Sequence, residues 1–514
     1  MKYLILISFL FSNIIYAQNK YDNIWKLGYS GDNGKIKNGI SLDFRHDPPL
    51  ATLDYLTVGY SATMASLCNK EGDLICHSRG FWLEDASGDT IPGSLNLVCH
   101  TDESFIPYIL KHGTYGAFQA NIMLPTPEKE NKEFFVFNFI NDTIRSYAND
   151  FAYARCNFTN KNIVTVLEKC HNATNAKQFQ PGNISACRHG NGRDWWIFAV
   201  EFDYRKGHIF LFTKDGIVQD NVFDITGAAY DPFDSGVTCF TNDGKKLAIY
   251  NHLNGLWIYD FNRCNGTVSN FRNIDFKGEK EEIAHNSGMG IANSPDSRYL
   301  YVSRTFYLYQ FDLHSPNIAE SKTLITQYDP NIDMNLGIPN AFNQLQLAPN
   351  NKIYMSLMSG EDFLHTIEKP NEKGVACDFK RRSQYLPALH AFALPNYPNF
   401  NLGKLVGSPC DTVSVATKDI KPEDFGIKLF PNPSSTIIKI DITLPQYDPT
   451  IKTEVVVVDV SGAIVMRYMM PDFAYIAELD ISKLPSGVYG VQLRQPQKSG
   501  TRVLATEKLV VIAD

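Results

Sequence analysis

A turn followed by a strand recurs along the middle of the 514-residue chain, and this repeat limits the possible folds more than any other feature. Each unit has a polar tight turn, one or two charged residues and an alternating apolar run. Asp, Asn and Gly are typical of such turns because they accept left-handed backbone or hydrogen-bond it locally. The clearest four units are NGRDWWIFAV (191–200), NDGKKLAIY (242–250), PDSRYLYVS (295–303) and PNNKIYMSL (349–357).

The spacing of these units is nearly constant. The equivalent turn positions are Asn191, Asp243, Asp296 and Asn350, which lie 52, 53 and 54 residues apart. Two weaker units, ENKEFFVFNF (130–139) and KEGDLICHS (70–78), extend the series backwards in steps of 60 residues. Six turn–strand units at such a spacing indicate a repeat architecture.

The length of the repeat selects the architecture. Helical periodicity is almost absent between residues 20 and 405, whereas units of about 40–50 residues built from about four strands are typical of WD40-like propeller blades. Strand-like pieces remain at both ends, NIWKLGYS with GISLDF in front and VACDFK onward behind. These pieces are expected to combine into a seventh blade that closes the ring. We therefore predict an all-β propeller over residues 18–406, with seven blades favoured and six or eight as alternatives.

The first residues, MKYLILISFLFSNIIYAQ, have the features of a secretory signal peptide. Lys2 gives a positive start, an apolar run follows, and Ala17 is a small residue suited to cleavage. The apolar run is too short for a stable membrane span. We therefore expect residues 1–17 to be removed, and no transmembrane segment to remain after signal cleavage.

Ten cysteines in an exported chain favour disulfides. No C-x-x-C pair occurs, which argues against a zinc ribbon or a thioredoxin-type site. Cys239 precedes the turn of one unit and Cys264 ends the partner strand of the same unit, while Cys377 and Cys410 bracket the closing segment. These placements predict the disulfides Cys239–Cys264 and Cys377–Cys410.

A second domain is predicted at the C-terminal end. Residues 407–426 are rich in small, polar and charged residues and are predicted to be a linker. Residues 427–514 contain about seven short alternating strands, which predicts a small Ig-like β-sandwich. Its opening phrase, IKLFPNPSS, should be extended and bent, because two prolines fix the backbone and remove donors. Gly487 is expected to need positive φ in the turn of LPSGVY.

This second domain resembles the C-terminal sorting domain of type IX secretion, type A. The matching phrases are LFPNPSS (429–435), VVDVSGAIV (457–465), LPSGVYGVQL (484–493) and EKLVV (507–511). The sorting-motif residues taken from these phrases are Leu429, Phe430, Pro431, Asn432, Pro433, Asp459, Gly462, Leu484, Pro485, Gly487, Tyr489, Lys508 and Leu509. The resemblance implies a Gram-negative bacterium, handling by the type IX secretion machinery, passage through the periplasm and outer membrane, and a secreted or surface location.

The region before it resembles a group of secreted bacterial propeller proteins of unknown biochemical role. Phrases such as TNDGKKLAIYN, NSPDSRYLYVS and LPNYPNFNLG carry this resemblance. It implies a propeller, and it brings no known catalytic residues to this chain.

The sequence contains no catalytic motif of a known kind: no H-E-x-x-H, no G-x-S-x-G, no P-loop and no EF-hand loop. We therefore expect no catalytic, cofactor-binding or metal site. A net charge of −7 without clustered Lys and Arg also argues against a nucleic-acid partner. Two local features stay open. For His285 an ordinary loop position is favoured, and a position at the mouth of the propeller is the alternative. Trp195 and Trp196 point to opposite faces of a strand, so one belongs to the core; for the other, inter-blade packing is favoured over a platform for sugar stacking.

Two function classes follow. The favoured one is a non-catalytic binding module that holds an unknown protein, peptide or glycan. The alternative is a propeller enzyme acting on glycans or peptides, with its site at the central channel. Three or more carboxylates, Arg or His meeting in a channel pocket would favour the enzyme.

Overall fold

The computed structural model divides the chain into two compact units, residues 1–412 and 413–514. It describes residues 19–31, 36–55, 63–78, 80–97, 119–141, 148–176, 178–180, 182–225, 236–251, 254–276, 289–329, 334–335, 338–390, 392–411, 426–443, 454–470, 476–497 and 500–512. The predicted signal peptide lies outside the described residues. No helix among the residues described is long and apolar enough to cross a membrane.

The described residues of unit 1 form seven antiparallel sheets of three or four strands, each in meander order, and we number these sheets 1 to 7 along the chain. Sheets 1 and 2 have three strands: β1 (Ile24–Gly31), β2 (Ile36–Asp43) and β3 (Leu50–Tyr55), then β4 (Ala65–Cys68), β5 (Leu74–Ser78) and β6 (Leu83–Asp85). Sheet 3 comprises β7 (Asn121–Pro125), β8 (Glu133–Asn141), β9 (Ala148–Phe158) and β10 (Val164–Asn172).

The other sheets of unit 1 have four strands each. They are β11 (Ser185–Arg188), β12 (Trp195–Val200), β13 (Lys206–Thr213) and β14 (Gly216–Asp224) in sheet 4, and β15 (Gly236–Phe240), β16 (Lys246–Asn251), β17 (Gly255–Asn262) and β18 (Thr267–Ile274) in sheet 5. Sheet 6 comprises β19 (Met289–Asn293), β20 (Tyr299–Arg304), β21 (Tyr307–Asp312) and β22 (Thr323–Gln327), and sheet 7 comprises β25 (Phe342–Leu347), β26 (Ile353–Leu357), β27 (Glu361–Ile367) and β28 (Phe379–His390). A short pair, β23 (Met334–Asn335) and β24 (Ile338–Pro339), and two 3₁₀ turns, Ala319–Ser321 and Gly374–Cys377, complete the described elements.

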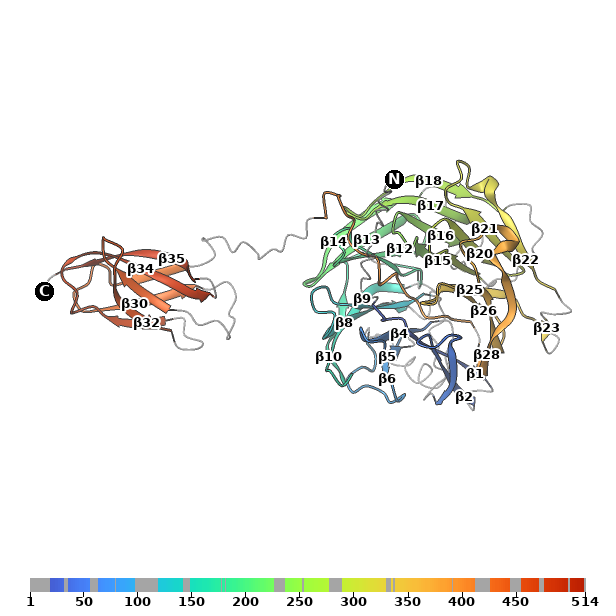
Figure 1. The fold of residues 1–514 in the computed structure, drawn as a ribbon, viewed down its shortest axis with the longest axis horizontal. Helices are drawn as coiled ribbons and strands as arrows, with labels where there is room; N and C mark the ends of the chain where they lie inside the picture. Colours follow the sequence, from blue (N-terminus) through green and yellow to red (C-terminus); the bar gives the residue numbers. More distant parts are fainter. Residues whose placement is uncertain are drawn as a thin grey trace, which may run out of the picture. The chain divides into compact units, whose positions relative to one another are not determined.

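The sheets follow one another around a ring, and the last lies beside the first (Figure 1). Each repeat turn predicted from the sequence is the hairpin between the first and second strands of a sheet, as between β15 and β16. The predicted apolar run is then the second strand. The seven-bladed propeller is therefore confirmed.

Apolar side chains fill the spaces between neighbouring sheets. Trp196 packs with Phe261 between sheets 4 and 5, with ring centroids 6.4 Å apart. Trp25 packs with Tyr354 between sheets 1 and 7, at 5.6 Å, so the same kind of core closes the ring. Alternating strand residues serve the two flanking interfaces, which explains the period of two in the sequence.

Ring closure differs from the sequence expectation. Residues from VACDFK onward form β28, which pairs with β27 in sheet 7 and not with the N-terminal strands. The backbone N–H of Cys68, at the end of β4, donates to the carbonyl of Tyr21, and the Ser66 hydroxyl donates to the carbonyl of Ile24 at 2.9 Å, so β1 runs opposite to β4. In a propeller, the second strand of a blade runs opposite to the inner strand of the next blade, so β1 has the direction of a second strand. Sheet 1 therefore lacks an inner strand of its own among the described residues.

Residues 392–411, which we call the closing segment, begin at that inner position and then run to the turns of sheets 4 and 5. Ala393 and Leu394 pack in the same apolar cluster as Trp25 and Leu27 of β1. The Tyr397 hydroxyl lies 3.3 Å from the carbonyl of Ile24. No strand forms here because Pro395 and Pro398 lack backbone N–H donors. Residues 407–411 of the predicted linker belong to this anchored segment, and residues 412–425 lie outside the described part of the chain.

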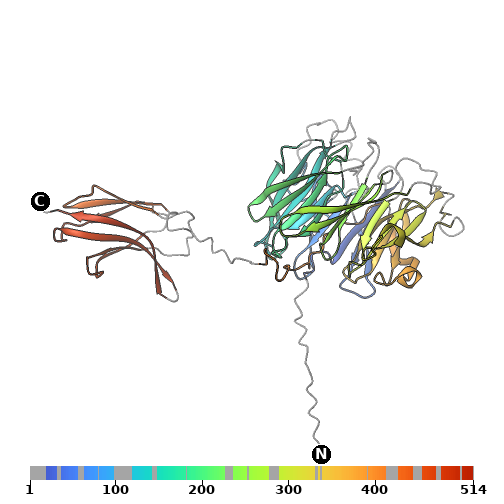
Figure 2. The ribbon, with the colours of Figure 1, turned by 90° about the horizontal axis from the view of Figure 1, so that it is seen from above.

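Unit 2 is a two-layer sandwich (Figure 2). One sheet contains β29 (Gly426–Phe430), β30 (Ile437–Thr443) and β33 (Ile476–Asp480). The other, in the order β32-β31-β34-β35, contains β31 (Glu454–Val458), β32 (Ile464–Met469), β34 (Gly487–Gln497) and β35 (Gly500–Val511). The bent phrase after Phe430 separates β29 from β30, as predicted.

Candidate functional sites: the channel cavity and the sorting motif

A cavity of about 200 Å³ lies between the inner strands of the propeller, in the space that we call the channel. The inner strands β11, β15, β19 and β25 contribute residues to its wall, and so do residues 396–399, 401 and 402 of the closing segment. The closing segment therefore forms part of the wall of this cavity.

Side-chain amides hold this wall together. The Gln119 side chain donates to the carbonyl of Thr238 at 3.0 Å and accepts from its N–H at 2.8 Å. Asn396 Nδ2 donates to the carbonyls of Asn121, at 3.1 Å, and Ile184, at 2.9 Å. On the channel side, an inner strand has no neighbouring strand to bond its backbone groups. The amide side chains bond these groups instead, which avoids the cost of a buried, unpaired peptide group. The amides are thus part of the framework.

Asp22 is the only Asp, Glu, Lys, Arg or His among the described residues that line the cavity. Burial raises the pKa of its carboxyl to about 7, because the charged form loses hydration there. Cys239 also lines the cavity, and burial raises the pKa of its thiol to about 12, so it is a protonated, weakly reactive group. Burial raises the pKa of the Cys187 thiol in the wall to about 12 as well, so Asp22 is the one group of the described wall with a pKa near neutral.

The two adjacent tryptophans are both fully buried, on opposite faces of β12. Trp195 Nε1 donates to the carbonyl of Pro125 in sheet 3, at 3.2 Å, and Trp196 Nε1 donates to that of Arg263 in sheet 5, at 2.7 Å. Inter-blade packing is confirmed, and the sugar platform is excluded because neither ring is accessible. His285 lies outside the described residues.

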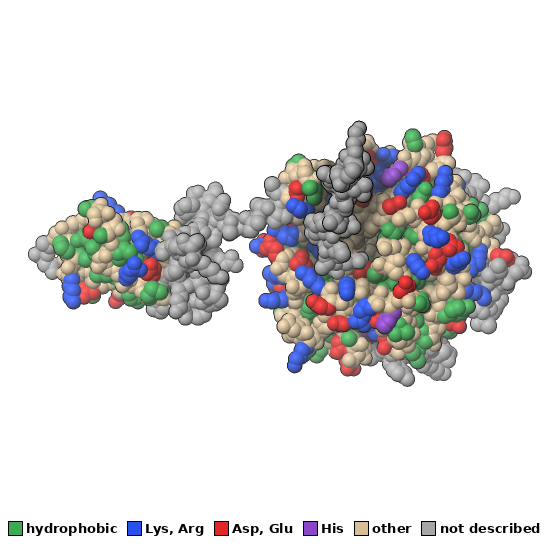
Figure 3. Space-filling view, in the orientation of Figure 1, with side chains coloured by type: hydrophobic (Ala, Val, Ile, Leu, Met, Phe, Trp, Pro, Cys, Tyr) green, Lys and Arg blue, Asp and Glu red, His purple; other side chains and the backbone are tan. Residues whose placement is uncertain are grey.

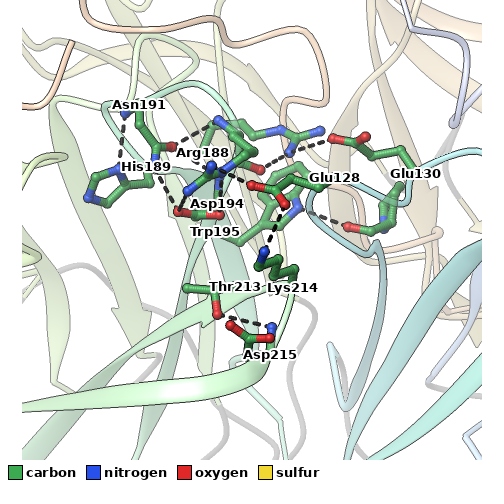
Figure 4. Close-up of polar contacts among 12 residues, drawn as sticks. Glu128, Glu130, Arg188, His189, Asn191, Asp194, Trp195, Thr213, Lys214 and Asp215 are labelled. Carbon is green, nitrogen blue, oxygen red and sulfur yellow. Dashed lines mark hydrogen bonds and ion pairs between the residues drawn. The ribbon is translucent and has the colours of Figure 1, made fainter. Parts of the chain in front are cut away.

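A polar cluster braces the neighbouring turns of sheets 3 and 4 (Figure 4). Arg188 is buried with its guanidinium 3.7 Å from the centre of the Trp195 ring, and burial lowers its pKa to about 10. Glu128 pairs with Lys214 at 3.3 Å, which ties the β7–β8 turn to the β13–β14 turn. Six charged side chains of this cluster are paired with one another, so we assign them a structural role; they are Glu128, Glu130, Arg188, Arg193, Asp194 and Lys214.

Charges on the outside are mixed. Figure 3 shows acidic and basic side chains interspersed on the face that it presents. Within the residues described, no group of three or more His, Cys, Asp or Glu is arranged to hold a metal ion.

The predicted disulfides are wrong in their pairing. Cys264 is bonded to Cys410, across 146 residues, while Cys239 and Cys377 are free. Cys239 lies within β15, and Cys377 is buried against sheet 6. Cys264 follows β17, in the turn that contacts the closing segment, so Cys410 of that segment is its partner. Cys170 is also disulfide-bonded. The Cys264–Cys410 bond fixes the end of the closing segment to sheet 5.

The sorting-motif residues fall into two groups in unit 2. Leu429, Phe430, Pro431, Asn432 and Pro433 run from β29 toward the end of β35, which carries Lys508 and Leu509. The Asn432 side chain bonds Lys508 and Val510 there, so the first and last phrases are in contact. Phe430 is half exposed and Lys508 is exposed, whereas Leu509 is buried.

The second group lies at turns. Asp459 accepts from the Ser461 hydroxyl and from the N–H groups of Ser461 and Ala463, and these bonds hold the pKa of its carboxyl below the ordinary value. Gly462 in the same turn has φ of +83°, a conformation that favours glycine.

The expectation for Gly487 is wrong. Gly487 begins β34 without positive φ, and an added Cβ would make only an ordinary contact, 3.6 Å from Tyr489. Tyr489 instead stabilises the turn after the partly buried Leu484, because its hydroxyl donates to the carbonyl of Pro485 at 2.8 Å.

Comparisons with known proteins agree with this division. Residues 428–511 match the family model described as "Secretion system C-terminal sorting domain". No curated protein matches the chain.

Several solved structures are similar to the chain. A protein from Lactobacillus plantarum has 12% identity and a TM-score of 0.41, with 73% of this chain and 99% of that chain covered. The Dos1 propeller has 12% identity and a TM-score of 0.34, covering 62% and 73%. Sqt1 of Saccharomyces cerevisiae has 10% identity and a TM-score of 0.37, covering 83% and 92%. These TM-scores are below 0.5, so the fold assignment rests on strand order and packing. The C-terminal part of the chain is a type IX secretion C-terminal sorting domain, and a β-propeller precedes it.

Proposed function

We propose that the protein is an exported, non-catalytic binding module. Its sorting domain delivers the propeller through the periplasm and outer membrane of a Gram-negative bacterium, and the propeller then holds an uncharged polar ligand, a glycan or a peptide, at the channel. The sorting-domain match supports export. The binding role is supported by one observation, the cavity whose described wall carries backbone groups, amides and hydroxyls around a single carboxyl.

The alternative, a propeller enzyme at the channel, has less support. Acid–base catalysis generally needs positioned groups with suitable pKa values within reach of the reacting bond. Asp22 has a raised pKa, yet the described wall supplies no second carboxyl, His, Lys or Arg beside it. A polar cavity of this kind is suited to hydrogen-bonding a sugar hydroxyl or a peptide amide.

An array of glycans and peptides, probed with the chain from residue 18 onward, tests the proposal. We expect selective binding by the wild-type protein and at least fivefold weaker binding by Asp22→Asn, which changes the one charge in the cavity. Asp215→Asn makes the same change on an exposed turn and should bind like wild type. Cleavage of any arrayed ligand that Asp22→Asn abolishes would favour the enzyme. Equal binding by all three proteins would remove the channel from the proposal.

A further inference from the structure

The last strand of the sorting domain is held by a segment far away in sequence. Within the described part of unit 2, β35 is an edge strand, since the sheet order is β32-β31-β34-β35 and only β34 pairs with it in the ladder. Residues 432–434 lie along the end of its other edge, with Ser434 and Val511 forming an isolated parallel bridge. The phrase at the start of the domain therefore lies against residues 508–512, the last ones that the structure describes.

The contacts at this edge form an alternating series. Asn432 Nδ2 donates to the carbonyl of Lys508 at 2.6 Å, and the N–H of Val510 donates to Asn432 Oδ1 at 2.9 Å. The Ser434 N–H donates to the carbonyl of Val510, and the Ile512 N–H donates to the carbonyl of Ser434, each at 3.1 Å. We call this set of four hydrogen bonds the terminal clamp. Its first two bonds come from one side chain that takes the place of a peptide group.

The chemistry of the phrase explains why this side chain is an amide. Pro431 and Pro433 have no backbone N–H, so the segment around Asn432 lacks the donors that a paired strand needs. A carboxamide supplies one donor and one acceptor side by side, as a peptide group does. Aspartate keeps an acceptor and loses the donor, and alanine loses both. Asn432 is itself exposed, so its role in the clamp is not the filling of the core.

The clamp fixes which side chains the domain presents. Leu509 and Val511 face the core, and Phe430, Lys508 and Ile512 remain exposed beside the clamp. A shift of β35 by one residue would exchange its inward and outward side chains, because the side-chain period of a strand is two. Holding the end of β35 therefore holds this exposed group in place.

We propose that Asn432 is a positioning residue for export: the terminal clamp joins the first and last phrases of the sorting domain into one surface that the secretion machinery recognises. The proposal rests on the proposed function, in which this domain directs export. It gives a physical reason for two phrases that lie more than seventy residues apart, at Asn432 and Lys508, to occur together in one sorting domain.

The test uses the full chain in a bacterium that has type IX secretion, with blotting of periplasmic and external fractions. Asn432→Asp keeps the size of the side chain and removes the donor to Lys508. We expect export at least fivefold below wild type, and hydrogen exchange of the Val510 amide at least tenfold faster in the purified protein. Asn432→Gln keeps both groups and should export better than Asn432→Asp. Ser482→Asp adds the same charge on an exposed turn and should export like wild type.

The outcomes separate the clamp from the proposed function. If deletion of residues 427–514 leaves export unchanged, the sorting assignment fails together with the clamp. If the deletion blocks export while Asn432→Asp is exported normally, only the clamp is refuted. Equal loss in Asn432→Gln and Asn432→Asp, or in Ser482→Asp and Asn432→Asp, would also refute it. Such a result would point to general destabilisation or to charge.

Discussion

Replacing Asn396 by alanine should weaken the propeller at the point where its ring closes. The Asn396 side chain is buried, and both of its amide hydrogens are used, one on the carbonyl of Asn121 in sheet 3 and one on that of Ile184 beside sheet 4. The substitution removes two hydrogen bonds and leaves two inner-strand carbonyls unpaired. Each buried carbonyl left unpaired costs about 1–3 kcal/mol, so the expected loss in the free energy of unfolding is about 2–6 kcal/mol.

Tryptophan fluorescence in denaturant measures this loss in the intact protein. All five tryptophans precede residue 258, so their signal reports on the propeller and not on the sorting domain. Asn401→Ala is the matched control, because the Asn401 amide bonds Asn19 at an exposed position in the same segment. We expect the control to change the free energy of unfolding by less than about 1 kcal/mol. Equal effects of the two substitutions would refute the idea that Asn396 fastens the closing segment across the channel.

Three further outcomes are expected. Replacing Cys264 and Cys410 by serine should lower the free energy of unfolding by roughly 2–5 kcal/mol in the chain-entropy model, measured by the same fluorescence assay with the reduced wild type as a check. Burial lowers the pKa of His390 to about 4, so the unfolded chain binds a proton at this residue before the folded protein does. The free energy of unfolding should therefore fall by up to about 3 kcal/mol as the pH falls from about 6.5 to 4. In His390→Gln, the denaturation midpoint should depend less on pH over this range. Gly462→Val should cost about 1–3 kcal/mol because of the positive φ, and Gly487→Val clearly less, as measured by amide exchange in β31.

The repeats could be predicted from sequence because each hairpin carries its own local signal. Asp243 and Gly244 mark a turn, and the alternating run from Lys246 follows directly, so neither needs knowledge of the rest of the chain. The sorting domain was identified in the same local way, by four short phrases. In both cases the information lies within about ten residues.

Ring closure and disulfide pairing could not be predicted in this way, because they depend on what the fold brings together. Residues 392–411 have no strand periodicity, and their partners are inner-strand carbonyls hundreds of residues away, such as that of Asn121. Cys239 and Cys264 are near in sequence, yet Cys239 is enclosed in β15 while Cys264 lies at the turn reached by Cys410. The cavity residue Asp22 was missed for the same reason, since nothing around it in sequence marks it as part of a channel wall.

In each unit, an asparagine side chain next to two prolines bonds backbone groups of a distant strand. In the propeller, Asn396 lies between Pro395 and Pro398 and bonds carbonyls of two sheets; in the sandwich, Asn432 lies between Pro431 and Pro433 and bonds the last strand. Prolines prevent the segment from becoming a paired strand, and the amide supplies hydrogen bonds that the backbone cannot. A paired strand in the same place would carry a second edge of unsatisfied backbone groups, which favours association between molecules. A segment held in this way offers no new strand edge to a neighbouring molecule.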